Sequence, residues 1–220
     1  MTAGELISDI IPPLKYNETG EKAMDWMNEL RVSHLPVVKG TEYIGLISEN
    51  DLYDMHDPSA KIKDCFPTLP KPFIYASQHV YELMKVIADQ KITVVPILDE
   101  NNHYLGCTDL LYLMSQITAI NSIKEPGSIL VLVMNTHDYS LTQLSRIVEE
   151  NNAKILSSYI TSMPDSTEIE VTLKINTDNL DRIIQTLVRY DYVIKATYQR
   201  GRFQDDLKRR YDELMNYLNM

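Results

Sequence analysis

The chain contains an internal repeat, and this repeat constrains the fold more than any other feature of the sequence. Residues 92–96 read I-T-V-V-P and correspond to V-S-H-L-P at residues 32–36, an offset of 60 residues. At the same offset Pro12 corresponds to Pro72. A repeated unit of this length normally cannot bury its apolar face alone. Two copies are too few for a solenoid, so we expect them to pack against each other as one module.

Each copy reads as a helix, two strands and a second helix. In the first copy, Val32 to Val38 is an apolar run rich in β-branched residues, and Gly40 allows a tight turn. Tyr43 to Ile47 forms the next strand. Ser48 then caps a helix, because its hydroxyl can accept a hydrogen bond from a free backbone N–H. Asp51 falls in the first turn of that helix, near the positive end of its dipole.

The run P-V-V, followed by G-L-I-S-E-N-D-L after an amphipathic helix, resembles the CBS domain. Two such units in tandem resemble a CBS pair, or Bateman module, over residues 6–114. The resemblance implies two βαββα repeats packed as one module, with domain boundaries at 1–60 and 61–122. In the second copy the match stops after Gly106.

After residues 121–127 (N-S-I-K-E-P-G) the pattern changes, which indicates a domain boundary. The following elements are expected: strand 129–134, helix 140–151, strands 155–161 and 168–175, helix 178–190 and strand 192–198. This βαββαβ order is typical of a ferredoxin-like fold. The first of these strands is continuously apolar, so we expect it to be covered on both faces, by helices on one face and by the same unit of a partner chain on the other.

After a CBS pair, this third unit (residues 123–200) resembles an ACT domain. The whole arrangement resembles the small CBS–ACT regulatory proteins of the AcuB (acetoin utilisation) type. Residues 201–220 form a predicted C-terminal amphipathic helix, with apolar side chains at helical spacing: Phe203, Leu207, Tyr211, Leu214 and Leu218. The predicted fold class is therefore α+β.

Bulk composition excludes several kinds of protein. A net charge of −10 argues against general nucleic-acid binding, although a single small anion responds only to local charge. No apolar run reaches the ~18–20 residues that span a bilayer, and the first residues lack the basic start of a signal peptide. Cys65 and Cys107 are not at metal-ligand spacing and are interpreted as free thiols. We expect a cytoplasmic protein with no membrane or nucleic-acid partner.

The sequence contains no catalytic motif: no G-x-S-x-G, P-loop, G-x-G-x-x-G, H-E-x-x-H or C-x-x-C. Its five histidines are scattered along the chain. We therefore expect a non-enzymatic protein with no metal site and no required cofactor.

The CBS resemblance implies a binding site for an adenosine nucleotide. In CBS domains that bind such ligands, a Ser or Thr three residues after a Gly and an Asp six residues after it contact the nucleotide. Gly45, Ser48 and Asp51 match this spacing. A helix N-terminus suits a phosphate, and a carboxylate beside it can accept from both ribose hydroxyls. The alternative is a capped helix with a solvated aspartate.

The same resemblance extends the site along the preceding strand. It directs the side chains of His34 and Arg31 toward the phosphates. It places the backbone around Leu35 and Val37 along the adenine. A structural or surface role is the alternative for both His34 and Arg31.

In the second copy the corresponding half-site is altered. Asp109 stands three residues after Gly106, and Tyr112 stands six residues after it. We expect this half-site, with Thr93, Asp109 and Tyr112, to be degenerate. Alternatively, a shortened loop moves Thr108 and Asp109 into register. Tyr112 either stacks on a base or packs at the rim of the core.

A weaker candidate site lies in the third unit. Asn135, Asp138 and Tyr139 occupy the turn where ACT domains bind amino acids. The Gly that usually marks that turn is missing. The alternative is a plain βα turn in which Ser140 caps the next helix.

These inferences predict a homodimeric sensor whose CBS pair binds AMP, ADP or ATP and shifts the relative orientation of its halves. The ACT domain would dimerise or contact an unknown protein target. Two alternatives stay open. One is a scaffold with empty CBS sites, and the other is an amino-acid sensor that uses the ACT dimer interface.

Overall fold

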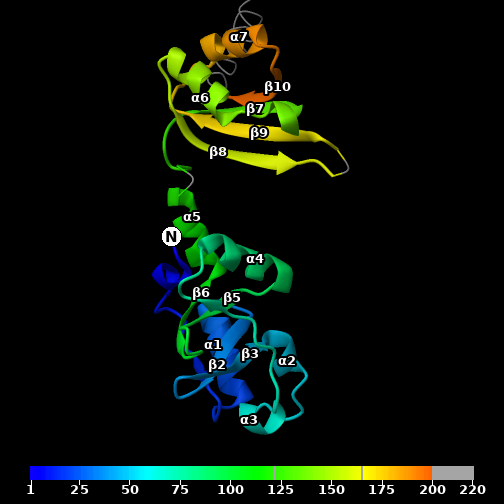
Figure 1. The fold of residues 1–220 in the computed structure, drawn as a ribbon. Coiled ribbons are helices and arrows are strands. Elements are labelled where there is room, and N and C mark those ends of the chain that lie inside the picture. The colour runs from blue at the N-terminus through cyan, green and yellow to red at the C-terminus, as the bar shows by residue number, and fades with distance from the viewer. Residues whose placement is uncertain (121, 165, 200–220) are drawn as a thin grey trace, which may run out of the picture. The chain divides into compact units, whose positions relative to one another are not determined.

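The computed structural model describes residues 1–120, 122–164 and 166–199 (Figure 1). Contacts divide the chain into two compact units, Met1–Ile117 (unit 1) and Thr118–Met220 (unit 2). The predicted C-terminal helix over residues 201–220 lies outside the described residues. Within the described part, no helix is both long and apolar enough to cross a bilayer.

Unit 1 contains both copies of the repeat, which have the same topology. The first copy comprises η1 (Ala3–Leu6), β1 (Leu14–Lys15), α1 (Gly20–Leu30), β2 (His34–Lys39), β3 (Glu42–Ser48) and α2 (Glu49–Tyr53). The second comprises α3 (Ile62–Cys65), β4 (Ile74–Tyr75), α4 (Val80–Gln90), β5 (Val94–Leu98), β6 (Tyr104–Asp109) and α5 (Leu110–Ile120). In both sheets a short first strand runs parallel to the middle strand, and the third strand is antiparallel to it.

Local sequence explains where the first copy's helix begins and ends. The Thr19 side chain accepts a hydrogen bond from the Lys22 N–H and caps the start of α1. At the other end Arg31 adopts a left-handed conformation with φ 56°, and its N–H donates to the carbonyl of Met27. The chain then turns directly into β2, so the capping residues set the position of that strand.

The N-terminal arm of each copy packs on the other copy. The N–H groups of Ala3 and Gly4 donate to the carbonyls of Gln78 (2.8 Å) and Ala76 (2.9 Å). Ser8 likewise donates to Cys107 of β6 at 2.9 Å. The first eight residues are therefore bound to the second copy.

The arm of the second copy makes the reciprocal contacts. The N–H of Ile62 donates to the carbonyl of Glu18 at 2.9 Å, and that of Lys63 donates to Tyr16 at 3.1 Å. Farther along, the carbonyl of Pro70 accepts from the Leu46 N–H at 2.8 Å. The predicted boundary at residue 60 separates the two copies in sequence. In the structure, the N-terminal arm of each copy packs on the other copy. We call these segments the exchanged arms.

The two hydrophobic cores of unit 1 contain residues from both copies. Val94 and Cys107, from the second copy, belong to the buried cluster built on the first. Leu46 of β3 belongs to the cluster built on the second copy, as do Ala3 and Leu6. Each core contains side chains from the other copy. The expectation that the two copies pack as a single module is therefore confirmed.

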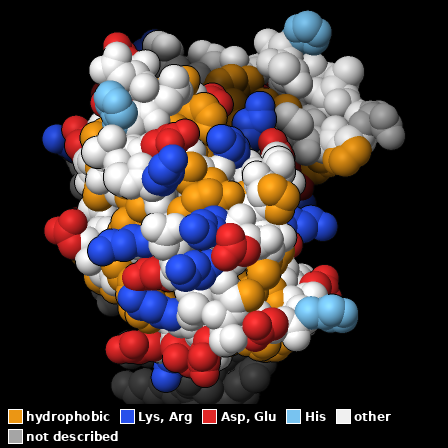
Figure 2. All heavy atoms as spheres, turned by 90° about the horizontal axis from the view of Figure 1, so that it is seen from below, with side chains coloured by type: hydrophobic (Ala, Val, Ile, Leu, Met, Phe, Trp, Pro, Cys, Tyr) orange, Lys and Arg blue, Asp and Glu red, His pale blue; other side chains and the backbone are white. Residues whose placement is uncertain are grey.

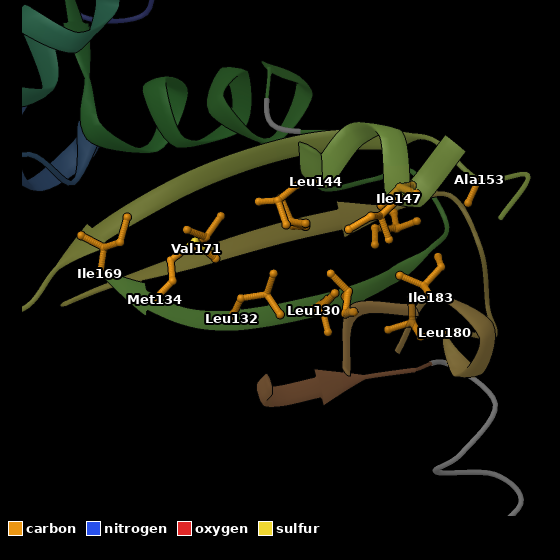
Figure 3. Close-up of a cluster of buried hydrophobic side chains, with 14 residues drawn as sticks. Leu130, Leu132, Met134, Leu144, Ile147, Ala153, Ile169, Val171, Leu180 and Ile183 are labelled. Carbon is orange, nitrogen blue, oxygen red and sulfur yellow. The ribbon is translucent and has the colours of Figure 1, made fainter. Parts of the chain in front are cut away.

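Unit 2 has the predicted βαββαβ order. Its elements are β7 (Ser128–Asn135), η2 (Thr136–Asp138), α6 (Leu141–Glu150), β8 (Ile155–Ser162), β9 (Glu168–Ile175), α7 (Asp181–Arg189) and β10 (Val193–Tyr198). The antiparallel strands lie in the order β10-β7-β9-β8. Figure 3 shows buried side chains of β7 and β9 packed against those of α6 and α7, among them Leu132, Val171, Leu144 and Ile183. The predicted α+β fold class is confirmed.

The strand predicted at residues 129–134 is expected to have helices on one face and a partner chain on the other, and the partner stays a prediction. In β7 the side chains alternate between buried and half-buried. Leu130, Leu132 and Met134 face the core, while Ile129, Val131 and Val133 lie on the opposite, open face of the sheet. Both helices cover the same face, so nothing within the described part of unit 2 buries the second set fully.

The close approach of the exchanged arm to β3 yields a testable prediction. A Cβ at Gly45 would lie 2.5 Å from the Leu69 Cβ and 2.7 Å from the Pro70 carbonyl oxygen. Gly45→Ala should therefore reduce the free energy of unfolding by about 1–3 kcal/mol. Urea unfolding monitored by fluorescence of Trp26, the single tryptophan of the chain, measures this loss in unit 1.

The matched control is Gly106→Ala, in the corresponding position of the second copy. There the new Cβ would meet Ile7 Cγ2, the end of a side chain that can rotate, at 2.5 Å. We expect a smaller loss for this variant. An equal or larger loss would contradict the account of the exchanged arm.

Candidate functional site

Ser48 and Asp51 come together at the junction of β3 and α2. Ser48 is the last residue of β3 and the N-cap of α2, with extended backbone angles of φ −101° and ψ 160°. Its hydroxyl oxygen accepts from the Asp51 N–H at 3.2 Å. Asp51 Oδ2 accepts in turn from the Ser48 N–H (2.8 Å) and from the Ser48 hydroxyl (2.6 Å). The two residues thus form a reciprocal capping box.

The capping box holds these two groups in fixed positions at a half-buried surface. Both contacts of the Asp51 side chain use Oδ2, and an ionised carboxylate offers about four acceptor positions. The side chain therefore retains acceptor capacity toward a hydroxyl donor. The pair caps α2, as expected if Ser48 and Asp51 serve only the helix. The acceptor positions that stay free on Asp51 are also compatible with a ligand.

His34 lies next to this pair, because β2 and β3 place His34 directly opposite Ser48. Its ring is directed to the second copy of the repeat. His34 Nδ1 lies 3.1 Å from Thr93 Oγ1, and the Thr93 N–H donates to the same Nδ1 at 3.3 Å. The Ser33 N–H donates to Thr93 Oγ1 at 3.1 Å. The structure thus brings together one residue from each predicted half-site.

Burial lowers the pKa of His34 below its ordinary value of 6.5, because the charged imidazolium would lose solvation. The carboxylates of Asp51 and Glu49 oppose this shift, since they favour a positive charge nearby. The desolvation effect is the larger of the two. His34 is therefore held in its neutral form near pH 7.

In the second copy, Asp109 occupies the place of Ser48. It ends β6, precedes α5, and accepts from the Tyr112 N–H at 2.9 Å. The pairing of Val94 with Asp109 matches that of His34 with Ser48, so the alternative shift of register does not occur. Tyr112 packs partly buried against the hydrophobic cluster, as the core or rim interpretation expects. Degeneracy of this half-site stays a prediction, and a buried carboxylate at the cap is consistent with it.

The remaining residues of the predicted site differ in accessibility. Arg31 is exposed at the end of α1. Leu35 and Val37 are completely buried in the core of unit 1. Their side chains are consequently committed to packing, and only their backbone could contact a ligand. A role in binding stays a prediction for all three.

In unit 2, Asn135 and Asp138 line a cavity of about 680 Å³. Tyr139 instead packs against the hydrophobic cluster. The charged side chains of the lining are all acidic: Asp138, Glu168 and Asp191. Burial and the nearby Asp138 raise the pKa of Tyr192, another lining residue. Among the described residues of the lining no cation faces the carboxylate that a free amino acid would bring.

Sequence reasoning missed most of this cavity. Glu168 begins β9, and Tyr190, Asp191 and Tyr192 join α7 to β10, far along the chain from the turn at Asn135. A signal was available in the βαββαβ order, because it places the end of the first strand beside the turn before the last strand. The positions of the side chains required the structure.

Lysines gather on one end of unit 1, the end that carries α3 in Figure 1. Figure 2 views the molecule from that end and shows Lys and Arg side chains near the middle of the face. Lys15 and Lys39 line a hollow of 310 Å³ beside Tyr16, whose carbonyl accepts from the Lys63 N–H. Neither lysine of the hollow forms an ion pair within the described residues.

Side chains that could bind a metal ion do not cluster within the described residues. Across residues 1–120, 122–164 and 166–199, no three His, Cys, Asp or Glu side chains come together in a group that could bind a metal ion. Cys65 is exposed and Cys107 is buried, and both are free thiols.

Comparison with known families identifies part of the chain. Residues 3–55 match the family model of the CBS domain. This segment includes Ser48 and Asp51 and ends just after α2. Among curated proteins no relative matches. The second copy repeats the same topology within this structure, so the CBS domain pair rests on the family match together with the internal repeat.

Several solved structures are similar to part of the chain. A CBS domain pair/ACT domain protein from Thermotoga maritima is 15% identical, covers 55% of this chain and 98% of its own, and gives a TM-score of 0.49. The CBS domains of a transcriptional regulator from Streptococcus pneumoniae are 19% identical over 52% and 98%, with a TM-score of 0.46. CBSX2 of Arabidopsis thaliana, solved in complex with AMP, is 16% identical over 54% and 97%, with a TM-score of 0.47. At these values they say nothing about the ligand of this chain.

The capping box predicts the effect of removing the Ser48 hydroxyl. Ser48→Ala leaves the Asp51 N–H without its partner and should lower the free energy of unfolding by about 1 kcal/mol. Ser48→Thr keeps a hydroxyl at the cap and should retain most of the stability. Urea unfolding followed by Trp26 fluorescence distinguishes the two variants. Equal losses for Ala and Thr would show that the hydroxyl does not cap α2.

Proposed function

We propose that this chain is a non-enzymatic regulatory protein whose paired repeats bind an adenosine nucleotide (AMP, ADP or ATP). The observation that supports this most strongly is the Ser48–Asp51 pair. It lies at the start of α2, inside the segment that matches the CBS family model. The spacing of Gly45, Ser48 and Asp51 is the one that the family uses for adenosine ligands. No cofactor is required by this function.

The roles of the two side chains follow from their chemistry. The Asp51 carboxylate is an acceptor and would receive the ribose hydroxyls, which are donors. The Ser48 hydroxyl can turn from Asp51 to a phosphate oxygen, because a hydroxyl rotates to suit its partner. On binding, the ligand would replace part of the capping box rather than add to it. Ligand binding should therefore loosen the cap and change the first turn of α2.

Regulation would follow from the way in which the two copies are joined. β2 and β5 are in contact, and the exchanged arms tie each copy to the other. A ligand that contacts both copies favours one relative arrangement of them by its differential affinity. The population of that arrangement then reports the nucleotide concentration to a protein target of unknown identity. The free thiols of Cys65 and Cys107 fit a reducing, cytoplasmic location.

For unit 2 we propose dimerisation of an ACT-like domain with a second copy of the chain. The open face of its sheet carries apolar side chains from three strands: Ile129, Val131 and Val133 of β7, Val193 and Tyr198 of β10, and Tyr159 of β8. Several of these are exposed, including Tyr159, Val193 and Tyr198. Covering such a face by a second copy would remove this apolar surface from water.

Two other functions compete with this proposal. A scaffold with empty CBS sites would show the same fold and no nucleotide binding. Amino-acid sensing through the turn of unit 2 would use the cavity at Asn135 and Asp138. Its acidic lining suits an ammonium group but supplies no side-chain cation for a carboxylate. This cavity therefore favours the nucleotide sensor over the amino-acid sensor.

A thermal-melt panel tests the nucleotide site. AMP, ADP, ATP, S-adenosylmethionine and the twenty amino acids are each added to the purified full-length chain. A nucleotide at 100 times its Kd stabilises the folded state by about 2.7 kcal/mol, which raises Tm by about 2–4 °C in a chain of this size. Asp51→Ala should abolish that shift.

Asp54→Ala is the matched control, because Asp54 is an exposed carboxylate at the other end of α2. It should leave the nucleotide shift intact. A shift that survives Asp51→Ala would place the site elsewhere. No shift with any nucleotide would favour the scaffold, and a shift with an amino acid alone would favour the sensor in unit 2.

The dimer proposal has its own test. Tyr159→Glu puts a charge on the open face of the sheet and should convert the dimer to a monomer, because an unpaired charge cannot be buried cheaply at an interface. Tyr53→Glu changes an exposed tyrosine of unit 1 and is the control. This variant should remain a dimer. Sedimentation equilibrium at micromolar concentration measures both. A wild-type monomer, or a Tyr159→Glu dimer, would refute this use of the open face.

A further inference from the structure

The hydrogen bonds around His34 fix the position of its hydrogen. The Thr93 N–H points to Nδ1, so Nδ1 must present a lone pair. The Thr93 hydroxyl already accepts from the Ser33 N–H and can direct its own hydrogen to Nδ1. Nδ1 is thus a double acceptor, and the ring hydrogen of the neutral histidine lies on Nε2. This assignment follows from the bonding partners.

Protonation would break this arrangement. A proton added to neutral His34 goes to Nδ1, the nitrogen that carries the lone pair. An N–H at that position would face the Thr93 N–H, so two donors would oppose each other across 3.3 Å. The hydrogen bond from the Thr93 N–H to the ring would be lost. The Thr93 hydroxyl would have to turn and accept from the new Nδ1–H, because Oγ1 keeps one free lone pair. The bond from the Thr93 N–H therefore exists only for the neutral ring.

The surroundings of the ring determine when protonation occurs. The charged groups that act on it are Asp51 and Glu49, both on α2. The group that faces it from the second copy is Thr93, which is uncharged. Burial outweighs the two carboxylates and lowers the pKa of His34 below 6.5.

The same residues position the first turns of α2 and α5. The carbonyl of Ser33, beside His34, accepts from the N–H of Glu49, the first residue of α2, at 2.9 Å. The carbonyl of Thr93 accepts from the N–H of Leu110, the first residue of α5, at 3.1 Å. These bonds are equivalent in the two copies. A change in the contact between His34 and Thr93 therefore moves the starts of both helices that form the two half-sites.

We propose that His34 and Thr93 form a hydrogen-bonded latch between the two repeats, which holds the Ser48–Asp51 site in its binding geometry while the ring is neutral and loses its bond from the Thr93 N–H when the ring gains a proton. In this account His34 is a positioning residue and not a phosphate ligand. The regulatory part of the inference rests on the proposed nucleotide function. The latch itself does not, since it is defined by contacts within the chain.

The latch can be tested without any nucleotide. Two-dimensional NMR of the full-length chain labelled with ¹⁵N-histidine identifies which ring nitrogen of His34 carries the hydrogen. We expect the Nε2–H tautomer, with a midpoint of protonation below 6.5. The protection factor of the Thr93 amide, which corrects for the intrinsic slowing of exchange at lower pH, should be high above pH 6.5 and should decrease as the pH falls through the lowered pKa. A hydrogen on Nδ1, or a Thr93 amide whose protection does not depend on pH, would overturn the proposal.

Three variants separate the latch from ordinary packing. His34→Asn keeps an acceptor near the position of Nδ1 and cannot titrate, so its Tm should depend less on pH between 7.5 and 5 than that of the wild type. His34→Ala loses the acceptor and should be destabilised at pH 7.5. Thr93→Val removes the hydroxyl, the group of Thr93 that can accept from the protonated ring, and should lower the pKa of His34 further. A steep pH dependence in His34→Asn equal to that of the wild type would contradict the latch.

Nucleotide titrations then connect the latch to function. In the wild type the Kd at pH 5.5 should exceed the Kd at pH 7.5, and in His34→Asn the ratio of the two should approach one. If the NMR results hold and no nucleotide binds at either pH, the latch stands and the proposed function fails. If a nucleotide binds while the ring carries its hydrogen on Nδ1, the function stands and the latch is refuted.

Discussion

Unit 1 depends on one constraint: neither copy of the repeat can complete its hydrophobic core alone. Each copy sends its N-terminal arm to the other, and both cores contain side chains from both copies. The cost of exposing that apolar surface, at about 25 cal/mol per Å², keeps the copies together. Because the arms approach β3 and β6 closely, glycines stand at positions 45 and 106. The arrangement also brings β2 and β5 together, with His34 and Thr93 where they meet.

Much of this fold could be predicted from the sequence, because its signals are local. The repeat at an offset of 60 predicted two copies in one module, and Ser48 was identified as a helix cap from its position after an apolar strand. The alternation and order of elements in unit 2 predicted its ferredoxin-like topology. In each case the determining residues lie within a few positions of the feature they specify.

The features that escaped prediction depend on contacts between distant residues. The exchange of arms cannot be distinguished in sequence from a connector that stays with its own copy. The hydrogen bonds between His34 and Thr93 join residues 59 positions apart, and the repeat only indicates that their strands are equivalent. The acidic cavity of unit 2 also depends on distant residues, because Asp138, Glu168 and Asp191 come from three separate segments.

The two half-sites of unit 1 differ by two substitutions that matter chemically. Where the first has the Ser48 hydroxyl and the Asp51 carboxylate, the second has the Asp109 carboxylate and the Tyr112 phenol. A carboxylate at the cap would repel a phosphate that a hydroxyl would bind. The internal repeat thus preserves the fold in both copies while their chemistry diverges. The account therefore requires one nucleotide per chain rather than two.

The stoichiometry of nucleotide binding tests this claim most directly. Isothermal titration calorimetry of AMP, ADP and ATP into the full-length chain measures it without any variant. The account predicts that at least one of these nucleotides binds with one molecule per chain. Two molecules per chain would show that the half-site at Asp109 is functional, and no binding of any of the three would contradict the account as a whole.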